Sequence, residues 1–144
     1  MRVFVDSNVI LDFFLARESH KEAVAELFGQ ICQEKVEAWT SASAIADIYY
    51  VVAKRLGQTR ARDVLIDLLG LLGIIAVDGS DCLEALELPI DDFEDALIVT
   101  CASKAGIDVI ITGDIDFLGV STPMARVVSV ADFLRENGLQ WGRG

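Results

Sequence analysis

The stretch Met1-Arg-Val-Phe-Val-Asp-Ser-Asn-Val-Ile-Leu-Asp12 decides the fold of this chain. Its segment Arg2–Val5 is rich in β-branched and aromatic residues, which predicts a short strand. Apolar residues then recur at helical spacing, which predicts a helix that Ser7 or Asn8 could cap. Asp6 therefore stands where a buried strand ends and a helix begins. Because ligands of open α/β sheets bind outside the carboxyl ends of the strands, Asp6 is a candidate for chemistry; the alternative is that it only caps the helix.

The rest of the chain alternates between strand and helix patterns. Further strands are expected at residues 36–40, 74–77, 109–112 and 127–128, and a turn at 113–117. Further helices are expected at residues 19–33, 44–55 (capped by Ser41 or Ser43), 60–69 (capped by Thr59), 78–86 (capped by Ser80 or Asp81), 91–104 and 130–136. This alternation predicts an α/β fold, with a central parallel sheet of four to five strands flanked by helices. One domain would cover residues 1–136, and residues 137–144 would form a C-terminal tail.

Composition excludes several classes of protein. Hydrophobic residues make up 53% of the 144 residues, which excludes a disordered chain. No stretch reaches the ~18 consecutive apolar residues that a membrane span needs, and the N-terminus lacks the pattern of a signal peptide. We therefore expect a cytoplasmic protein with no membrane partner. The three cysteines include no C-x-x-C pair, which argues against a thiolate metal site or a disulfide framework.

The formal net charge is −11, and the pI is about 4.3. A protein that holds nucleic acid by charge alone is usually basic. This chain therefore either avoids nucleic acid or relies on bound cations and a local basic strip. Its densest basic group, Lys54, Arg55, Arg60 and Arg62, could contact phosphates or form a solvated helix face. The negative charge also suits a cationic partner protein.

Acidic residues occur at corresponding ends of successive strand–helix units. Asp6 ends the first strand, and Asp114 and Asp116 follow the fourth. Asp47 and Asp95 lie near the starts of two helices whose N-termini are expected on the same side of the sheet. The spacing thus predicts one acidic cleft. Taken singly, each acid could equally be a helix-end charge or a turn residue.

Carboxylates that share a cleft repel one another and raise each other's pKa, and a divalent cation removes this repulsion. Oxygen ligands without His or Cys suit hard ions, so the expected cofactor is Mg²⁺ or Mn²⁺. Such ions can hold a phosphodiester, activate water and stabilise a leaving oxygen. The sequence therefore favours a metal-dependent phosphodiester hydrolase.

Three stretches resemble motifs of the PIN domain family. Asp6-Ser-Asn-Val-Ile-Leu-Asp12 is similar to the opening motif, Phe93-Glu-Asp-Ala-Leu-Ile98 to the third and Ile111-Thr-Gly-Asp-Ile-Asp-Phe117 to the fourth. The resemblance covers Met1 to about Phe133 and is strongest to VapC-like proteins. It implies a parallel sheet wrapped by helices and Mg²⁺- or Mn²⁺-dependent cleavage of RNA. It also implies a toxin held silent by an antitoxin, and a homodimer.

The resemblance also implies roles for individual residues. Asp6, Asp95 and Asp114 would coordinate the metal, with Asp116 as the alternative to Asp114. Asp47 matches a position that is usually Glu, and because Asp is one methylene shorter it would contact a metal through water.

Two further polar residues match the family pattern. Asn8 and Thr112 would orient acids or water, or else serve only as capping and turn residues. Asp at position 47 and the strong negative charge keep a second function open, that of a catalytically weak or inactive PIN-like protein acting through protein partners.

Overall fold

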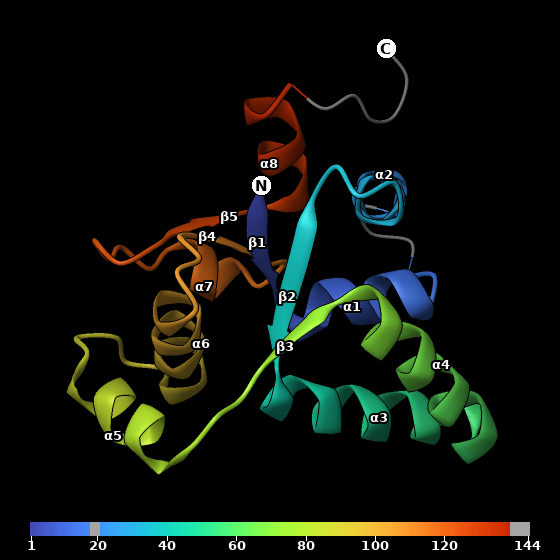
Figure 1. The fold of residues 1–144 in the computed structure, drawn as a ribbon, viewed down its shortest axis with the longest axis horizontal. Helices are drawn as coiled ribbons and strands as arrows, with labels where there is room; N and C mark the ends of the chain where they lie inside the picture. The colour runs from blue at the N-terminus through green and yellow to red at the C-terminus, as the bar shows by residue number, and fades with distance from the viewer. Residues whose placement is uncertain (18–20, 139–144) are drawn as a thin grey trace.

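The computed structural model describes residues 1–17 and 21–138. Its centre is a five-stranded sheet in the order β3-β2-β1-β4-β5, and every neighbouring pair is parallel (Figure 1). The strands are β1 (Arg2–Val5), β2 (Glu37–Ser41), β3 (Gly73–Ile75), β4 (Val109–Ile111) and β5 (Arg126–Val128). The predicted α/β fold with a parallel sheet of four to five strands is therefore confirmed.

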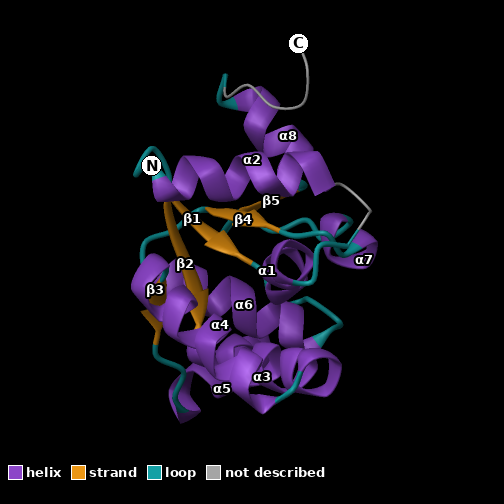
Figure 2. Cartoon of the chain, turned by 90° about the vertical axis from the view of Figure 1, so that its right-hand side faces the viewer, coloured by secondary structure: helices purple, strands orange, loops and turns teal. Residues whose placement is uncertain are grey.

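Eight helices surround this sheet within the described residues. They are α1 (Ser7–Phe14), α2 (Lys21–Cys32), α3 (Ala42–Leu56), α4 (Gln58–Leu71), α5 (Gly79–Glu87), α6 (Phe93–Lys104), α7 (Ile115–Leu118) and α8 (Val130–Glu136). Figure 2 shows the strands enclosed between helices, with α2 and α8 side by side. No helix in the described parts of the chain is both long and apolar enough to cross a membrane.

Alternating side chains of the strands build a core on each face of the sheet. Val3 and Val5 of β1 pack with apolar residues of α1 to α4 and α8. Phe4, between them in sequence, points to the opposite face and packs with residues of α6 and α7. The period of two in a strand thus places β1 at the centre of three layers. Packing on both faces of the sheet therefore holds β1, and with it the carboxyl end of the strand, in place.

Several predicted helix starts are wrong by a few residues. The alternative role of Asp6 as a cap is confirmed: Asp6, rather than Ser7 or Asn8, caps α1, and its carboxylate accepts a hydrogen bond from the Ser7 N–H (2.8 Å). Gly57, not Thr59, precedes α4. In each case the residue with extended or positive-φ backbone directly before the helix takes the cap position, and for α4 this residue lies earlier than the side-chain type of Thr59 suggested.

Three other boundaries differ from prediction. Asp78 caps α5, in a reciprocal capping box with Asp81. Gly70, expected to break a helix, lies inside α4 because tertiary packing of the Leu68 turn outweighs the weak helix propensity of glycine. Residues 113–117 are not only a turn, since Asp114 caps the short helix α7. The predicted helix start at Ser19 and the tail from residue 139 lie outside the described residues.

Candidate active site

Asp6 follows the central strand and is held by an ordered set of donors. Its main-chain N–H donates to the Ile111 carbonyl of β4 (2.9 Å). The Thr112 hydroxyl (2.8 Å) and the Asn8 amide (3.3 Å) both donate to Asp6 Oδ2. Asn8 Oδ1 in turn accepts from the Gly113 N–H (2.9 Å). This network fixes the Asp6 carboxylate between the start of α1 and the end of β4.

Asp114 belongs to the same network through the turn after β4. Its N–H donates to Thr112 Oγ1 (3.1 Å), and its Oδ1 accepts from the Asp116 N–H (3.0 Å). Both Asp114 and Asp116 are exposed. The charge of Asp114 contributes to raising the pKa of Asp6, so Asp114 is the acid of the pair that the structure links to Asp6.

A small pocket lies beside Asp6 at the carboxyl edge of the sheet. Asp6, Asp47 of α3 and Glu94 of α6 all line it, together with Ser41 and Ser43 at the start of α3. Its accessible volume is about 20 Å³, which is enough for one water molecule or a small ion. Three carboxylates from separate parts of the chain therefore share one small space.

Asp95 is the most perturbed acid of the group. Its side chain is only 6% exposed, and burial together with the charges of Asp92, Asp114, Asp6 and Glu94 raises its pKa to about 7. Burial also raises the pKa of Asp6, although the hydrogen bonds from Thr112, Ser7 and Asn8 oppose this shift. The charges of Asp6 and Asp114 therefore lie close enough to Asp95 to raise its pKa.

Glu94 is a residue that the sequence prediction missed. It lines the pocket, and burial, followed by the charges of Asp47 and Asp6, raises its pKa. The signal was present in the motif Phe93–Ile98, where two consecutive acids occupy the first turn of a helix. Adjacent helical residues point about 100° apart, and of these two acids Glu94 lines the pocket whereas Asp95 lies buried beside it in sequence.

The donor chemistry of this cleft suits a hard divalent cation. No Lys or Arg forms an ion pair with Asp6, Asp47, Glu94, Asp95 or Asp114 among the described residues. The side chains are not already gathered as a set of three at coordinating distance within residues 1–17 and 21–138. The feature that suits a metal ion is therefore the negative charge of these carboxylates, which no Lys or Arg in the described part of the chain balances.

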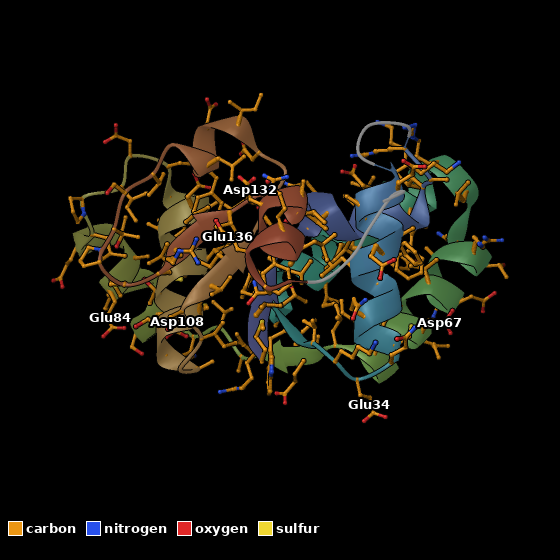
Figure 3. The ribbon with its side chains drawn as sticks, turned by 90° about the horizontal axis from the view of Figure 1, so that it is seen from above. Glu34, Asp67, Glu84, Asp108, Asp132 and Glu136 are labelled. Atoms are coloured by element: carbon orange, nitrogen blue, oxygen red, sulfur yellow. The ribbon has the colours of Figure 1, made fainter. Side chains whose placement is uncertain are left out.

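The predicted basic group lies away from this cleft. Lys54 and Arg55 are in the last turn of α3, and Arg60 and Arg62 are in the first turns of α4; all four are exposed. Seven residues separate Lys54 from Asp47, which corresponds to about 10 Å along a helix axis. Acidic residues, by contrast, occur all around the molecule, with Glu84 and Asp67 at opposite ends of the view in Figure 3.

Comparison with known proteins places this geometry in context. A model described as the PIN domain matches residues 2–116. Ribonuclease VapC1 of Aquifex aeolicus (strain VF5) is 28% identical over 137 residues, which cover 92% of this chain and 92% of that protein.

Solved structures share the fold at lower sequence identity. Mycobacterium tuberculosis VapC20, described as a sarcin-ricin loop cleaving toxin, has a TM-score of 0.67 at 19% identity, covering 86% of this chain and 98% of that one. A chain from a toxin–antitoxin complex of Klebsiella pneumoniae has a TM-score of 0.63 at 19% identity, covering 89% of this chain and 97% of that one.

Proposed function

Because this chain belongs to the PIN domain family, we propose that it is a metal-dependent endoribonuclease that hydrolyses RNA phosphodiester bonds. The observation that carries the proposal is the convergence of Asp6, Asp47 and Glu94 on one pocket, with Asp95 and Asp114 near enough to perturb its charges. A cluster of acids that no basic side chain balances is costly unless a cation joins it.

Asp6, Asp95 and Asp114 would hold the ion, Mg²⁺ or Mn²⁺, with Asp47 and Glu94 reaching it through water. When bound, such an ion binds phosphate oxygens, lowers the pKa of water and stabilises the leaving oxygen. The chain's own residues would position the carboxylates that hold the ion. Asn8 and Thr112 hold the Asp6 carboxylate in one orientation through three hydrogen bonds between side chains.

The proposed biological role is that of a toxin controlled by an antitoxin. Its support is the likeness to VapC1, which is named a ribonuclease, and the shared fold with a chain of a toxin–antitoxin complex. The net charge of −11 is complementary to a cationic antitoxin segment. Homodimerisation and a cytoplasmic location, where RNA is the accessible substrate, belong to the same proposal.

The alternative function is a weak or inactive PIN-like protein that acts through protein partners. Two observations favour it: Asp47 is shorter than the expected Glu, and the described carboxylates are not gathered at coordinating distance. The two functions differ in one measurable property, which is hydrolysis of RNA by the purified protein in Mg²⁺ or Mn²⁺.

The decisive test is cleavage of a pool of random-sequence single-stranded RNA in Mn²⁺ by the wild-type chain and by Asp6→Asn. We expect Asp6→Asn to lower the rate by roughly 10²-fold or more, because it removes an anionic ligand while keeping the shape of the side chain. Asp108→Asn, on an exposed residue before β4, is the matched control and should cleave normally. Wild-type protein that is folded yet cuts no RNA would favour the alternative function.

A further inference from the structure

A second pocket is lined by Thr112, a residue of the Asp6 hydrogen-bond network. Its accessible volume is about 170 Å³, close to that of cavities of ~150 Å³ that bind one benzene ring. Val9 of α1, Val24 of α2, Leu118 of α7 and Ala131 of α8 form its largely apolar walls. Four helices thus enclose a space of the size that a single flat ring fills.

Thr112 connects this pocket directly to the proposed active site. The residue lines the pocket, while its hydroxyl donates to Asp6 Oδ2 (2.8 Å). Gly113, the next residue, also lines the pocket, and its N–H donates to Asn8 Oδ1 (2.9 Å). A group seated here would therefore lie one residue away from the Asp6 network.

Asp12 supplies a charged group to a wall whose other polar side chains are those of Thr112 and Ser129. Its carboxylate is 19% exposed, and its Oδ1 accepts from Arg17 Nη1 (3.3 Å). Among the described residues no donor contacts Asp12 Oδ2. This oxygen lies 3.9 Å from the position that a Cβ atom on Gly113 would take. Ile115, 83% exposed, lies at the same pocket and offers an apolar face to solvent. An ionised carboxylate accepts hydrogen bonds only, so Asp12 favours a ring that carries a donor.

We propose that this pocket binds one base of the RNA strand beside the cleaved phosphodiester, and that Asp12 selects bases with an exocyclic amino group. Adenine, cytosine and guanine carry such a group, whereas uracil presents carbonyl oxygens on both sides of its single N–H. Apolar walls with a few placed polar groups are typical of small-ligand sites. The proposal rests on the proposed function, since it assumes that RNA occupies the acidic cleft.

The first experiment measures binding without catalysis. Isotope-labelled protein is titrated with adenosine, cytidine, guanosine and uridine 5′-monophosphates in EDTA, and amide signals of Gly113, Val130 and Ala131 are followed by NMR. We expect the three amino-bearing nucleotides to shift these signals and uridine monophosphate to bind roughly tenfold more weakly. Equal shifts by all four nucleotides, or none, would overturn the base assignment.

The second experiment reads cleavage of the random RNA pool by sequencing the new 5′ ends. Wild-type protein should show roughly tenfold depletion of uracil at one position next to the cut. Asp12→Asn, which keeps the shape of the side chain, and Ala131→Leu, which fills the pocket, should each remove this depletion while cleavage continues. Ala25→Leu, on the exposed side of α2, is the matched control and should retain it.

The two arms separate this inference from the proposed function. Cleavage without any positional preference overturns the base pocket and leaves the ribonuclease intact. A chain that cuts nothing contradicts the proposed function, and the nucleotide titration still decides whether the pocket binds bases. Loss of affinity for a basic antitoxin peptide in Ala131→Leu, with the uracil depletion unchanged, would assign the pocket to a protein side chain and overturn the proposal.

Discussion

Two acidic regions at strand ends of this molecule are built in opposite ways. Beyond β3, Asp78 and Asp81 form a capping box, and Lys104 of α6 donates to Asp81 Oδ2 (2.6 Å) and to the Ala76 carbonyl (2.7 Å). Beyond β1 and β4, Asp6, Asp95 and Asp114 have no basic partner among the described residues. Both regions contain a buried carboxylate, since Asp81 is 2% and Asp95 6% exposed.

The difference distinguishes an acid cluster that stabilises the fold from one whose charges have no partner within the described residues. Hydrogen bonds from Ser80 and from the Asp81 N–H lower the pKa of Asp78, and the nearby Lys104 charge acts in the same direction. In the other cluster, burial and like charges raise the pKa of Asp95 to about 7. The chain neutralises one acid cluster with its own lysine and provides no basic partner for the other among the described residues, and this is the cluster for which we propose an external cation.

The largest contrast is expected when one buried acid of each region is neutralised. Asp81→Asn should lower the free energy of unfolding by about 1–2 kcal/mol, because it weakens the capping box and removes the charged partner of Lys104, whose exposed side chain water can still solvate. Asp95→Asn should instead raise the stability of the metal-free protein, because it removes repulsion. Urea denaturation in EDTA measures both, and equal losses in the two variants would erase the distinction between the regions.

Added metal should sharpen the contrast. At a Mn²⁺ concentration of 100 times Kd, binding to the native state adds about 2.7 kcal/mol of stability and raises Tm. We expect this rise in wild-type protein and in Lys104→Gln, but little of it in Asp95→Asn. Differential scanning calorimetry with and without Mn²⁺ makes the comparison. A full response in Asp95→Asn would move the metal to another site.

Acid should affect the two regions in opposite directions. Folded Asp95 keeps its proton up to about pH 7, whereas an unfolded Asp loses it near pH 4. Between these values the native state binds more protons, so stability falls as pH rises and the loss is complete above about pH 8. Tm in EDTA should therefore be roughly 3–10 °C lower at pH 8 than at pH 5.

The same titration in Asp95→Asn supplies the control, since most of this slope should vanish. Asp78, whose pKa is lowered, contributes stability that is lost only below about pH 4, outside the range measured. An unchanged slope in Asp95→Asn would show that other groups cause the pH dependence.

The smallest effect concerns the distant basic group. If Arg60 and Arg62 contact phosphates, the double charge reversal Arg60→Glu and Arg62→Glu should weaken RNA binding by severalfold and reduce the salt slope by about 2. Fluorescence anisotropy of labelled RNA at several salt concentrations measures both quantities. Unchanged affinity and slope would show that these arginines form a solvated helix face and do not contact RNA.

Much of the fold was predictable because its signals are local. The strand Arg2–Val5 and the helix Val130–Glu136 were predicted with the observed bounds, since alternation and capping residues mark them directly. The short helix α7 was missed because its four residues are too few for a periodic pattern. The caps of α4 and α5 were misplaced because backbone conformation as well as residue type decides which residue takes the cap position.

The sequence by itself determined the succession of strands and of the longer helices along the chain, and with it the edge of the sheet where Asp6 and Asp114 stand. Hydrophobic period and parallel topology are enough for that. Only the tertiary structure decided that Glu94 shares the pocket with Asp6 and that Lys104 neutralises Asp81. Burial and charge–charge interactions depend on distances between side chains far apart in the chain, and residue spacing carries no record of those distances.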